Sequence, residues 1–372
     1  MPGYRIISSD NHVMEPPDLW TSRVEPKYRD RCPQLITVEG GQVWVCDGRR
    51  GNNPAQGAQP GVRFEHPERL TRLDTFENVR PGGYIPEEHV KDMDADGIDV
   101  SLLYPSAGLR LFGTVPDGDL LTAVFRAYND YVAEFFRPYP KRLAGIAMIN
   151  LDDVQVGVQE MERCRHMGFV GAMITVYPPE GRRYDSPGYE PLWAVAQDLE
   201  MPLSLHAATN RYGSGEAFQL VDTARLAHLC NMDMGVRMSL ADMIYSGVFE
   251  RYPKLQVGAV EHELSWVPHF LDRLDYNYNQ RSAGIVGYRF QEDMQPSDYF
   301  RRNVFLGFQE DALGIQLRDH IGVDTLQWGS DYPHQESTFP RTREILEAIL
   351  SACTEDEKAK IVGGNAARVY GF

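Results

Sequence analysis

The sequence predicts a (β/α)8 TIM barrel with a small β insertion near its amino terminus. Three observations lead to this fold class. The chain has 372 residues, a length typical of such barrels when they carry insertions. Short apolar segments alternate with segments of helical periodicity along most of the chain, which favours a parallel sheet covered by helices. No linker or short-period repeat interrupts this alternation, so we expect a single domain over residues 1–372.

The first strand is expected in the apolar run at residues 4–7. The stretch Ser9-Asp10-Asn11-His12-Val13-Met14-Glu15-Pro16 follows it directly. Alternate residues of an extended chain point the same way, so Asp10 and His12 are expected to direct a carboxylate and an imidazole at one point just past the strand end. The prolines that follow turn the chain away from any helix.

The β insertion is expected at about residues 31–65. Residues 35–38 and 42–45 flank a Glu-Gly-Gly turn and predict a small hairpin. Residues 48–61 are rich in Gly, Pro, Asn and Gln and predict a mobile loop. Such a loop is either a lid over a functional site or a surface decoration.

From residue 86 onward the predicted strands and helices alternate. The strands are short and apolar, at residues 98–103, 143–149, 169–176, 201–205, 255–260, 303–306 and 326–328. The helices carry an apolar stripe or a start signal, at residues 86–96, 121–128, 154–167, 192–199, 238–252, 266–274 and 365–370, with a further one opening at the capping box Thr354-x-x-Glu357. Together with the first strand this makes about eight strands, as a barrel requires.

Composition excludes several classes of function. The chain has 37 basic and 53 acidic residues, a net charge of −16, which argues against binding nucleic acid or an anionic membrane surface. No signal peptide and no apolar run near the ~20 residues of a membrane span is visible. The five cysteines are scattered without C-x-x-C spacing, which indicates reduced thiols and a cytoplasmic protein.

Side chains of the metal-ligand type follow four of the predicted strands. They are Asp10 and His12 after the first strand, His206 after the fifth, Glu261 and His262 after the sixth, and Asp331 after the eighth. The carboxyl ends of all barrel strands lie on one face, where active sites are found. A single histidine is more often a packed core residue. Metal-ligand side chains at the ends of four different strands, however, predict a common site.

Two imidazoles and two carboxylates, from Asp10, His12, His206 and Asp331, form the expected metal site. This mixture suits Zn²⁺, Mn²⁺ or Fe²⁺ better than Ca²⁺ or Mg²⁺, and it lacks a thiolate that would select a softer ion. An open position on such an ion would polarise a carbonyl or carboxylate, or lower the pKa of a bound water.

Four motifs carry a resemblance to a known family. They are Asp10-x-His12-x-x-Glu15-Pro16, residues 246–253 (SGVFERYP), residues 328–334 (WGSDYPH) and residues 364–370 (GNAARVY). In combination they resemble the amidohydrolase-related family, which includes the aminocarboxymuconate-semialdehyde and resorcylate decarboxylases. The resemblance covers nearly the whole chain except residues 48–61. It implies a (β/α)8 barrel with one catalytic divalent metal, ligands at the four positions above, and Asp331 as proton donor or base.

The chain departs from the family pattern at three places. Aminocarboxymuconate-type members begin with H-x-H, where this chain has Asp10-x-His12. The decarboxylases often carry His-Gly-Gly after strand six, where this chain has Glu261-His262-Glu263. The strand-four lysine of two-metal hydrolases is absent from residues 168–176, so no bridging carbamate is expected.

Further polar residues are expected near the same mouth: Glu15, Glu261, His262, His334 and Glu336. Either they support and orient the ligands, with His262 and His334 assisting Asp331 in catalysis, or some of them bind metal. The metal-binding candidates are Glu15, Glu261 and His262, and the extra imidazole of His262 would add capacity for a second ion. In the second case the chain would resemble 2-aminoisobutyrate hydroxylase subunits, which hold a dinuclear iron- or manganese-containing site.

Two further residues, Arg211 and Tyr332, are expected to bind a substrate carboxylate, although Arg211 as an ordinary surface residue is the alternative. Three functions stay open. The first is a mononuclear metal-dependent lyase or hydrolase acting on a small carboxylated compound, with Asp331 as acid or base. The second is a dinuclear oxygenase, and the third is a non-catalytic subunit. By family analogy the chain forms a homodimer or a hetero-oligomer with a related chain.

Overall fold

The computed structural model describes residues 3–215, 226–281 and 289–372. Its main sheet has eight parallel strands whose spatial order follows the chain: β1 (Ile7–Val13), β5 (Val100–Pro105), β6 (Leu143–Met148), β7 (Gly171–Ile174), β8 (Leu203–His206), β9 (Val257–Val260), β10 (Val304–Phe308) and β11 (Leu326–Trp328). The expected (β/α)8 barrel is confirmed.

The residues just past β11 close the barrel against β1. The N–H of Ser330 donates to Oγ of Ser8 over 2.8 Å. The N–H of Asp331 donates to the Asp10 carbonyl over 2.8 Å, and the N–H of His12 donates to the Tyr332 carbonyl over 2.7 Å. The last and first strands are therefore joined at the level of the expected metal ligands.

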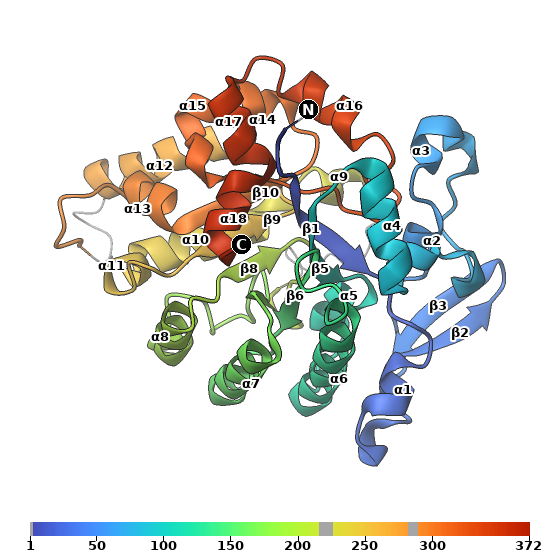
Figure 1. Ribbon diagram of the computed structural model, residues 1–372. Helices are drawn as coiled ribbons and strands as arrows, with labels where there is room; N and C mark the ends of the chain where they lie inside the picture. Colours follow the sequence, from blue (N-terminus) through green and yellow to red (C-terminus); the bar gives the residue numbers. More distant parts are fainter. Residues whose placement is uncertain (1–2, 216–225, 282–288) are drawn as a thin grey trace.

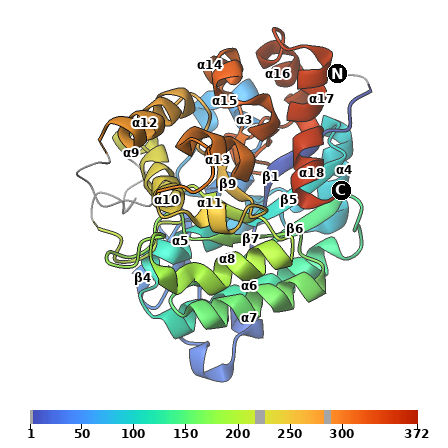
Figure 2. The same ribbon diagram turned by 90° about the vertical axis from the view of Figure 1, so that its left-hand side faces the viewer.

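Helices surround the strands (Figures 1 and 2). The longer ones are α4 (Pro86–Asp96), α6 (Gly118–Phe136), α7 (Val154–Met167), α8 (Glu190–Asp198), α10 (Asp233–Tyr245), α12 (Val267–Gln280), α13 (Pro296–Asn303) and α16 (Thr342–Ile349). In both views α6, α7 and α8 lie side by side along one flank of the sheet. The chain ends with α17 (Glu355–Ala359), which opens on the expected capping box at Thr354 and Glu357, and with α18 (Asn365–Tyr370).

Two predicted elements differ from the structure, and a helix after β5 was not predicted. β1 runs through His12 to Val13 and does not stop at residue 7, because its pairing with β5 continues to Pro105 after a register shift. The predicted helix 238–252 is two helices, α10 and α11 (Val248–Arg251), since Gly247 between them has a φ of 74°. The helix α5 (Ala107–Thr114) was not predicted.

The insertion contains the predicted hairpin, formed by β2 (Gln34–Val38) and β3 (Gly41–Cys46), with β4 (Arg49–Arg50) added at its edge. It projects away from the barrel in Figure 1. The segment predicted as a mobile loop instead holds β4 and the helical turn α2 (Ala55–Ala58). Gln59 after it is 4% exposed and exchanges two hydrogen bonds with the backbone of Thr71.

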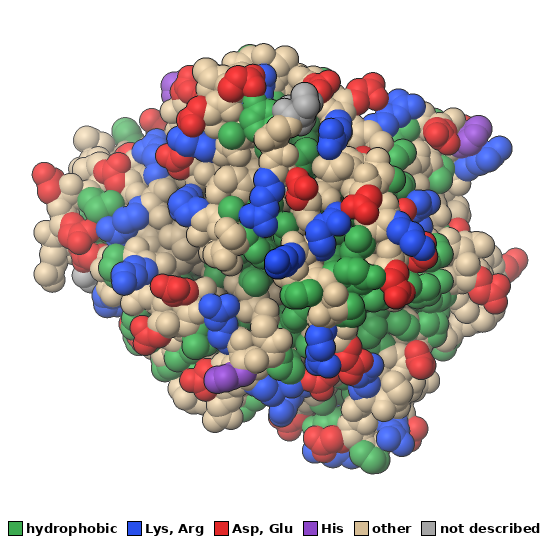
Figure 3. Space-filling view, in the orientation of Figure 1, with side chains coloured by type: hydrophobic (Ala, Val, Ile, Leu, Met, Phe, Trp, Pro, Cys, Tyr) green, Lys and Arg blue, Asp and Glu red, His purple; other side chains and the backbone are tan. Residues whose placement is uncertain are grey.

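On the face shown in Figure 3, acidic and basic side chains are interspersed. Among the described residues, no helix combines the length and apolar character needed to cross a membrane. The five cysteines are unpaired, and four of them are buried.

Candidate metal centre

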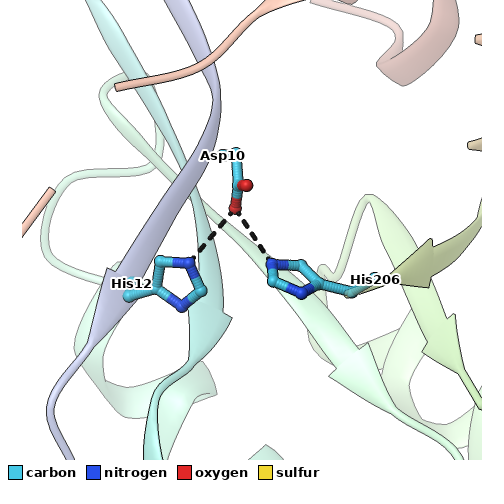
Figure 4. A group of neighbouring side chains, drawn as sticks. All are labelled: Asp10, His12 and His206. Atoms are coloured by element: carbon cyan, nitrogen blue, oxygen red, sulfur yellow. Dashed lines mark ion pairs between the residues drawn. The ribbon is translucent and has the colours of Figure 1, made fainter. Parts of the chain in front are cut away.

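The four expected ligands come together at the carboxyl ends of three strands. Asp10 and His12 belong to β1, His206 is the last residue of β8, and Asp331 follows β11. Their exposed fractions are 5%, 0%, 0% and 2%. Figure 4 shows the carboxylate of Asp10 between the imidazoles of His12 and His206.

Short distances link the ligand atoms of this group. Nε2 of His12 lies 3.3 Å from Oδ1 of Asp10 and 3.0 Å from Oδ1 of Asp331. Nε2 of His206 lies 3.4 Å from the same Asp10 oxygen. These nitrogens and oxygens are buried without a hydrogen-bond partner. Buried polar atoms nearly always have a hydrogen-bond partner. Several unpartnered nitrogen and oxygen ligand atoms that face one point therefore fit a metal ion.

The outer nitrogen of each imidazole is held by a backbone carbonyl. Nδ1 of His12 lies 2.7 Å from the carbonyl oxygen of Pro105. Nδ1 of His206 lies 3.0 Å from the carbonyl oxygen of Ala207. A carbonyl can only accept, so each Nδ1 donates a proton to it, and each Nε2 is the nitrogen that faces the centre and is left to bind a cation. Metal-binding histidines are oriented in the same way.

Backbone conformation brings the β11 end close to β1. Gly329 passes so near Asp10 that a Cβ at position 329 would lie 2.7 Å from the Cβ of Asp10 and 2.9 Å from its backbone nitrogen. Any larger residue would therefore push β11 away from β1. Asp331 itself has a φ of 63°, and Glu261, at the end of β9, has a φ of 60°. Such strained conformations in non-glycine residues cluster at functional sites.

Electrostatics keep the two carboxylates ionised. Burial alone would raise the pKa of Asp10, but the imidazoles of His206 and His12 hold it below its usual range. In the same way His334 and His12 outweigh burial and depress the pKa of Asp331. Burial would lower the pKa of His12, yet the carboxylates of Asp10 and Asp331 raise it well above its usual value. Two charged carboxylates are thus available to a cation.

A third histidine supports Asp331. Nδ1 of His334 lies 2.9 Å from Oδ1 of Asp331, and Nε2 of His334 lies 2.9 Å from Oγ of Ser106. The His334 ring stacks on His12 with 4.0 Å between centroids. Ser106 was not among the predicted residues. Its signal in the sequence is its position directly after the strand that became β5, the same place that the other site residues occupy after their strands.

Three of the predicted site residues, Glu15, Arg211 and Tyr332, have partners away from the metal centre. Both carboxylate oxygens of Glu15 accept N–H groups from Ser106, Ala107 and Gly108 at the start of α5, over 2.8 to 3.2 Å. Glu15 therefore caps a helix, and the structure does not place it among the ligands.

Neither residue predicted to bind a substrate carboxylate is directed to the metal centre. Arg211 is 3% exposed and binds Asp152 together with the carbonyls of Phe112 and Val115. The hydroxyl of Tyr332 donates to Asp92. Both side chains are held by hydrogen bonds to other segments of the chain.

The residues after β9 border the centre. Nε2 of His262 donates to the Leu205 carbonyl over 3.2 Å, and its Nδ1 has no partner. Burial and the charge of His206 lower the pKa of His262 to about 3, so this imidazole is neutral. Oε2 of Glu261 lies 3.4 Å from Nδ1 of His206. Oxygens of Glu261, Asp331 and Glu336 lie within 4.8 Å of one another.

Comparison with known proteins gives one family and several relatives. The family model described as Amidohydrolase matches residues 42–372. Gamma-resorcylate decarboxylase of a Polaromonas species is 26% identical over 307 residues, which are 77% of this chain and 87% of that protein. An amidohydrolase of Mycobacterium avium subsp. paratuberculosis has a similar structure, with a TM-score of 0.81, 24% identity and 100% of both chains covered.

A second solved structure is that of 5-carboxyvanillate decarboxylase of Novosphingobium aromaticivorans. It has a TM-score of 0.70 and 22% identity, and the match covers 100% of this chain and 97% of that one. That protein was crystallised with manganese and 4-hydroxy-3-methoxy-5-nitrobenzoic acid.

Proposed function

This chain belongs to the amidohydrolase family, and we propose that it is a metal-dependent decarboxylase of small aromatic carboxylic acids. The observation that carries the proposal is the set of unpaired, buried ligand atoms of Asp10, His12, His206 and Asp331. The named relatives, a gamma-resorcylate and a 5-carboxyvanillate decarboxylase, supply the class of reaction and of substrate.

The metal is proposed to be Mn²⁺. Two imidazoles and two carboxylates suit this ion, and the carboxyvanillate decarboxylase was crystallised with manganese. A divalent ion held there would act as a Lewis acid on the substrate carboxylate and on an adjacent phenolic oxygen.

Asp331 is proposed to move the proton. When the bond between the ring and the carboxylate breaks, its electron pair stays on the ring carbon as CO₂ leaves, and that carbon must receive a proton. Asp331 is ionised before the reaction, and its Oδ2 has no partner, so this oxygen can take the proton of the substrate's phenolic hydroxyl and pass it to the ring carbon. His334 holds Oδ1 of the same carboxylate, and Ser106 fixes the other side of that imidazole.

His262 is proposed to contact the substrate. Its Nε2 is fixed by the Leu205 carbonyl, so its unpartnered Nδ1 is an acceptor. A neutral acceptor beside the centre can take a hydrogen bond from a phenolic hydroxyl of the substrate. In this role His262 orients the ring, whereas Asp331 delivers the proton.

Neither alternative function has comparable support. Hydrolysis would use the same ligands and Asp331, and the structure from Mycobacterium avium subsp. paratuberculosis is named as an amidohydrolase, but the two relatives reported above whose names state a substrate are decarboxylases. None of the relatives reported above is named as an oxygenase, so they do not support the function of a dinuclear oxygenase.

The proposal is tested by CO₂ release. Protein loaded with Mn²⁺ is incubated with 2,6-dihydroxybenzoate, 5-carboxyvanillate and other hydroxybenzoates, with unsubstituted benzoate as the matched compound that lacks a phenolic oxygen. We expect CO₂ from at least one hydroxylated acid and none from benzoate, and no turnover by His12→Ala. Fully metallated protein that releases no CO₂ from any compound of the panel would refute the proposal.

A further inference from the structure

Tyr332, the residue directly after Asp331, is fixed at three points. Its N–H donates to Oδ1 of Asn11 over 3.2 Å, and its carbonyl oxygen accepts the N–H of His12 over 2.7 Å. Its hydroxyl donates to Oδ2 of Asp92, on α4. Tyr332 is only 3% exposed, so solvent competes little for these bonds. The backbone that leads out of Asp331 is therefore held by residues of both β1 and α4.

The carboxylate that accepts this hydroxyl is itself held by an arginine. Nε and Nη2 of Arg80 donate to Oδ2 and Oδ1 of Asp92 over 2.7 and 2.6 Å. The guanidinium also lies over the ring of Phe339, 4.7 Å from its centroid. A guanidinium that binds both oxygens fixes the position and the orientation of the carboxylate. Asp92 therefore offers the Tyr332 hydroxyl an acceptor with a defined position.

Close packing restricts the Tyr332 ring as well. The imidazole of His89 meets this ring edge-on with 5.2 Å between centroids, and the ring of Phe339 lies at 5.1 Å. Gly82 leaves room for the hydroxyl, because a Cβ at position 82 would overlap both that hydroxyl and Oδ2 of Asp92. Since a closely packed interior transmits strain, a change at the hydroxyl is expected to reach the backbone of the same residue.

Asp331 needs such support because its backbone is strained. Its φ of 63° lies in the left-handed region that residues other than glycine seldom adopt, and a residue stays there only where the surrounding structure imposes it. The same backbone sets the place of the carboxylate, whose Oδ1 lies 3.0 Å from Nε2 of His12 and 2.9 Å from Nδ1 of His334. Relaxation of the Asp331 backbone would withdraw the carboxylate from both imidazoles.

We propose that Arg80, Asp92 and Tyr332 form a positioning chain that holds the Asp331 carboxylate where it binds metal and moves the proton. The three residues act through the backbone of Asp331, so their role is positioning and not catalysis. This role replaces the substrate contact that the sequence predicted for Tyr332. The inference rests on the proposed function, since it takes Asp331 as a metal ligand and as the group that moves the proton.

The test uses Tyr332→Phe, which removes the hydroxyl and keeps the ring, and Asp92→Ala, which removes its acceptor. Tyr252→Phe is the matched control, because the chain repeats the same arrangement there. The hydroxyl of Tyr252 donates to Oε2 of Glu190 over 2.8 Å, and the guanidinium of Arg251 binds both oxygens of that glutamate. This second arrangement joins α8 to the end of α11, so the control loses a similar hydrogen bond outside the Asp331 segment.

Two quantities are measured on full-length protein. Metal-free protein is titrated with Mn²⁺, with free Mn²⁺ followed by electron paramagnetic resonance, and kcat and KM are measured on a hydroxylated acid that the wild type decarboxylates. In Tyr332→Phe we expect the Kd for Mn²⁺ to rise at least about tenfold, as when the support of a metal ligand is lost. We expect kcat to fall roughly 10- to 100-fold, because a misplacement of about 1 Å has such an effect, and KM to stay constant.

Asp92→Ala should show the same changes, and the double variant should be no worse than the more affected single variant, because both substitutions break one chain. Asp92→Ala decides by the same criteria if Tyr332→Phe does not fold. Tyr252→Phe should keep the wild-type Kd and kcat. These results together would support the positioning chain. Additive losses in the double variant would overturn it, because the two residues would then act independently.

The remaining outcomes separate the two proposals. Folded Tyr332→Phe with the Kd and kcat of the wild type would overturn the positioning chain and leave the proposed function standing. A KM that rises while kcat and the Kd stay constant would also overturn it, and would place the hydroxyl on the substrate. If the wild type binds Mn²⁺ but releases no CO₂, the proposed function fails, and the Kd alone decides on the positioning chain. A wild type that binds no Mn²⁺ would overturn both.

Discussion

The N–H of Asp331 donates to the carbonyl oxygen of Asp10 over 2.8 Å, so two proposed metal ligands from opposite ends of the chain are joined through their own backbones. The backbone contacts that close the barrel therefore also bring these two metal ligands together. A cation bound between these residues would hold the last strand against the first.

Metal binding is expected to stabilise the folded chain as a result. A ligand that binds only the native state at 100 times its Kd adds about 2.7 kcal/mol to the free energy of unfolding. Mn²⁺ at that concentration should raise the midpoint of chemical denaturation, and a chelator should reverse the change. His12→Ala, which removes a central ligand, should show no response to Mn²⁺. Equal responses of the variant and the wild type would contradict a site built on His12.

Asp331→Asn tests the proton-transfer role. The amide keeps the size of the side chain but cannot deliver a proton, and positioned acid groups contribute roughly 10²- to 10⁴-fold to rates. We expect a loss of at least about 100-fold in kcat with a native circular dichroism spectrum. Asp324→Asn, which alters an aspartate with an exposed side chain in the turn just before β11, is the control. Turnover within a few fold of the wild type would assign the proton to another group.

Glu15→Ala separates a helix cap from a metal ligand. The carboxylate accepts three N–H groups at the start of α5 and is 2% exposed. Its removal leaves buried donors unpaired, at a cost of roughly 1–3 kcal/mol in the free energy of unfolding. Metal stoichiometry should not change. Glu15→Gln, which retains one acceptor oxygen, should lose less stability; loss of bound metal in either variant would show that Glu15 is a ligand after all.

Arg211→Met should affect stability and not substrate binding. The guanidinium is buried against Asp152 and two backbone carbonyls. Removing one partner of a buried ion pair costs roughly 3–5 kcal/mol, and we expect the lower end because Asp152 is 25% exposed. The denaturation midpoint should fall while KM stays constant. A KM that rises tenfold at unchanged stability would instead support the substrate contact predicted from the sequence.

The strand ends were predictable from the sequence because their signal is local. A short apolar run followed by an Asp, His or Glu marks both a strand and its polar end, and in a barrel all such ends meet. Asp331 was therefore located correctly after its strand, whereas His206, expected just after the fifth strand, is the last residue of β8. Asp10 and His12 were placed just past a strand that in fact contains them, because the pairing of β1 with β5 extends it and no single-chain pattern shows a pairing partner.

The misplaced site residues depend on contacts between distant segments. Glu15 was grouped with the ligands because it follows them in sequence, but its direction is set by the N–H groups of α5. That helix was itself missed, since Gly108 and Gly113 weaken its helical propensity. Arg211 was taken for a substrate anchor because its buried partner, Asp152, could not be identified from spacing. Local sequence patterns thus located the site. The hydrogen-bond partners of the long side chains could be identified only once the fold was known.

His89 should make stability sensitive to mild acid. It is fully buried between the Gly82 carbonyl, 2.8 Å from Nδ1, and the Ser101 hydroxyl, 3.0 Å from Nε2, and burial lowers its pKa to about 4. A histidine in the unfolded chain has a pKa of about 6.5, so between these values the unfolded state binds more protons. Stability contributed by neutral His89 is present above pH 6.5 and is lost as the pH falls through 4.

The full effect of this shift is about 3 kcal/mol, of which about 2 kcal/mol should already be lost at pH 5. Urea denaturation at pH 7 and at pH 5 measures it. His89→Gln has no proton to bind in this window, so its stability should fall less between the two pH values than that of the wild type. His269→Gln, which alters an exposed histidine on α12, should behave as the wild type does. If wild type and His89→Gln lose the same stability between pH 7 and pH 5, the acid sensitivity arises from other groups.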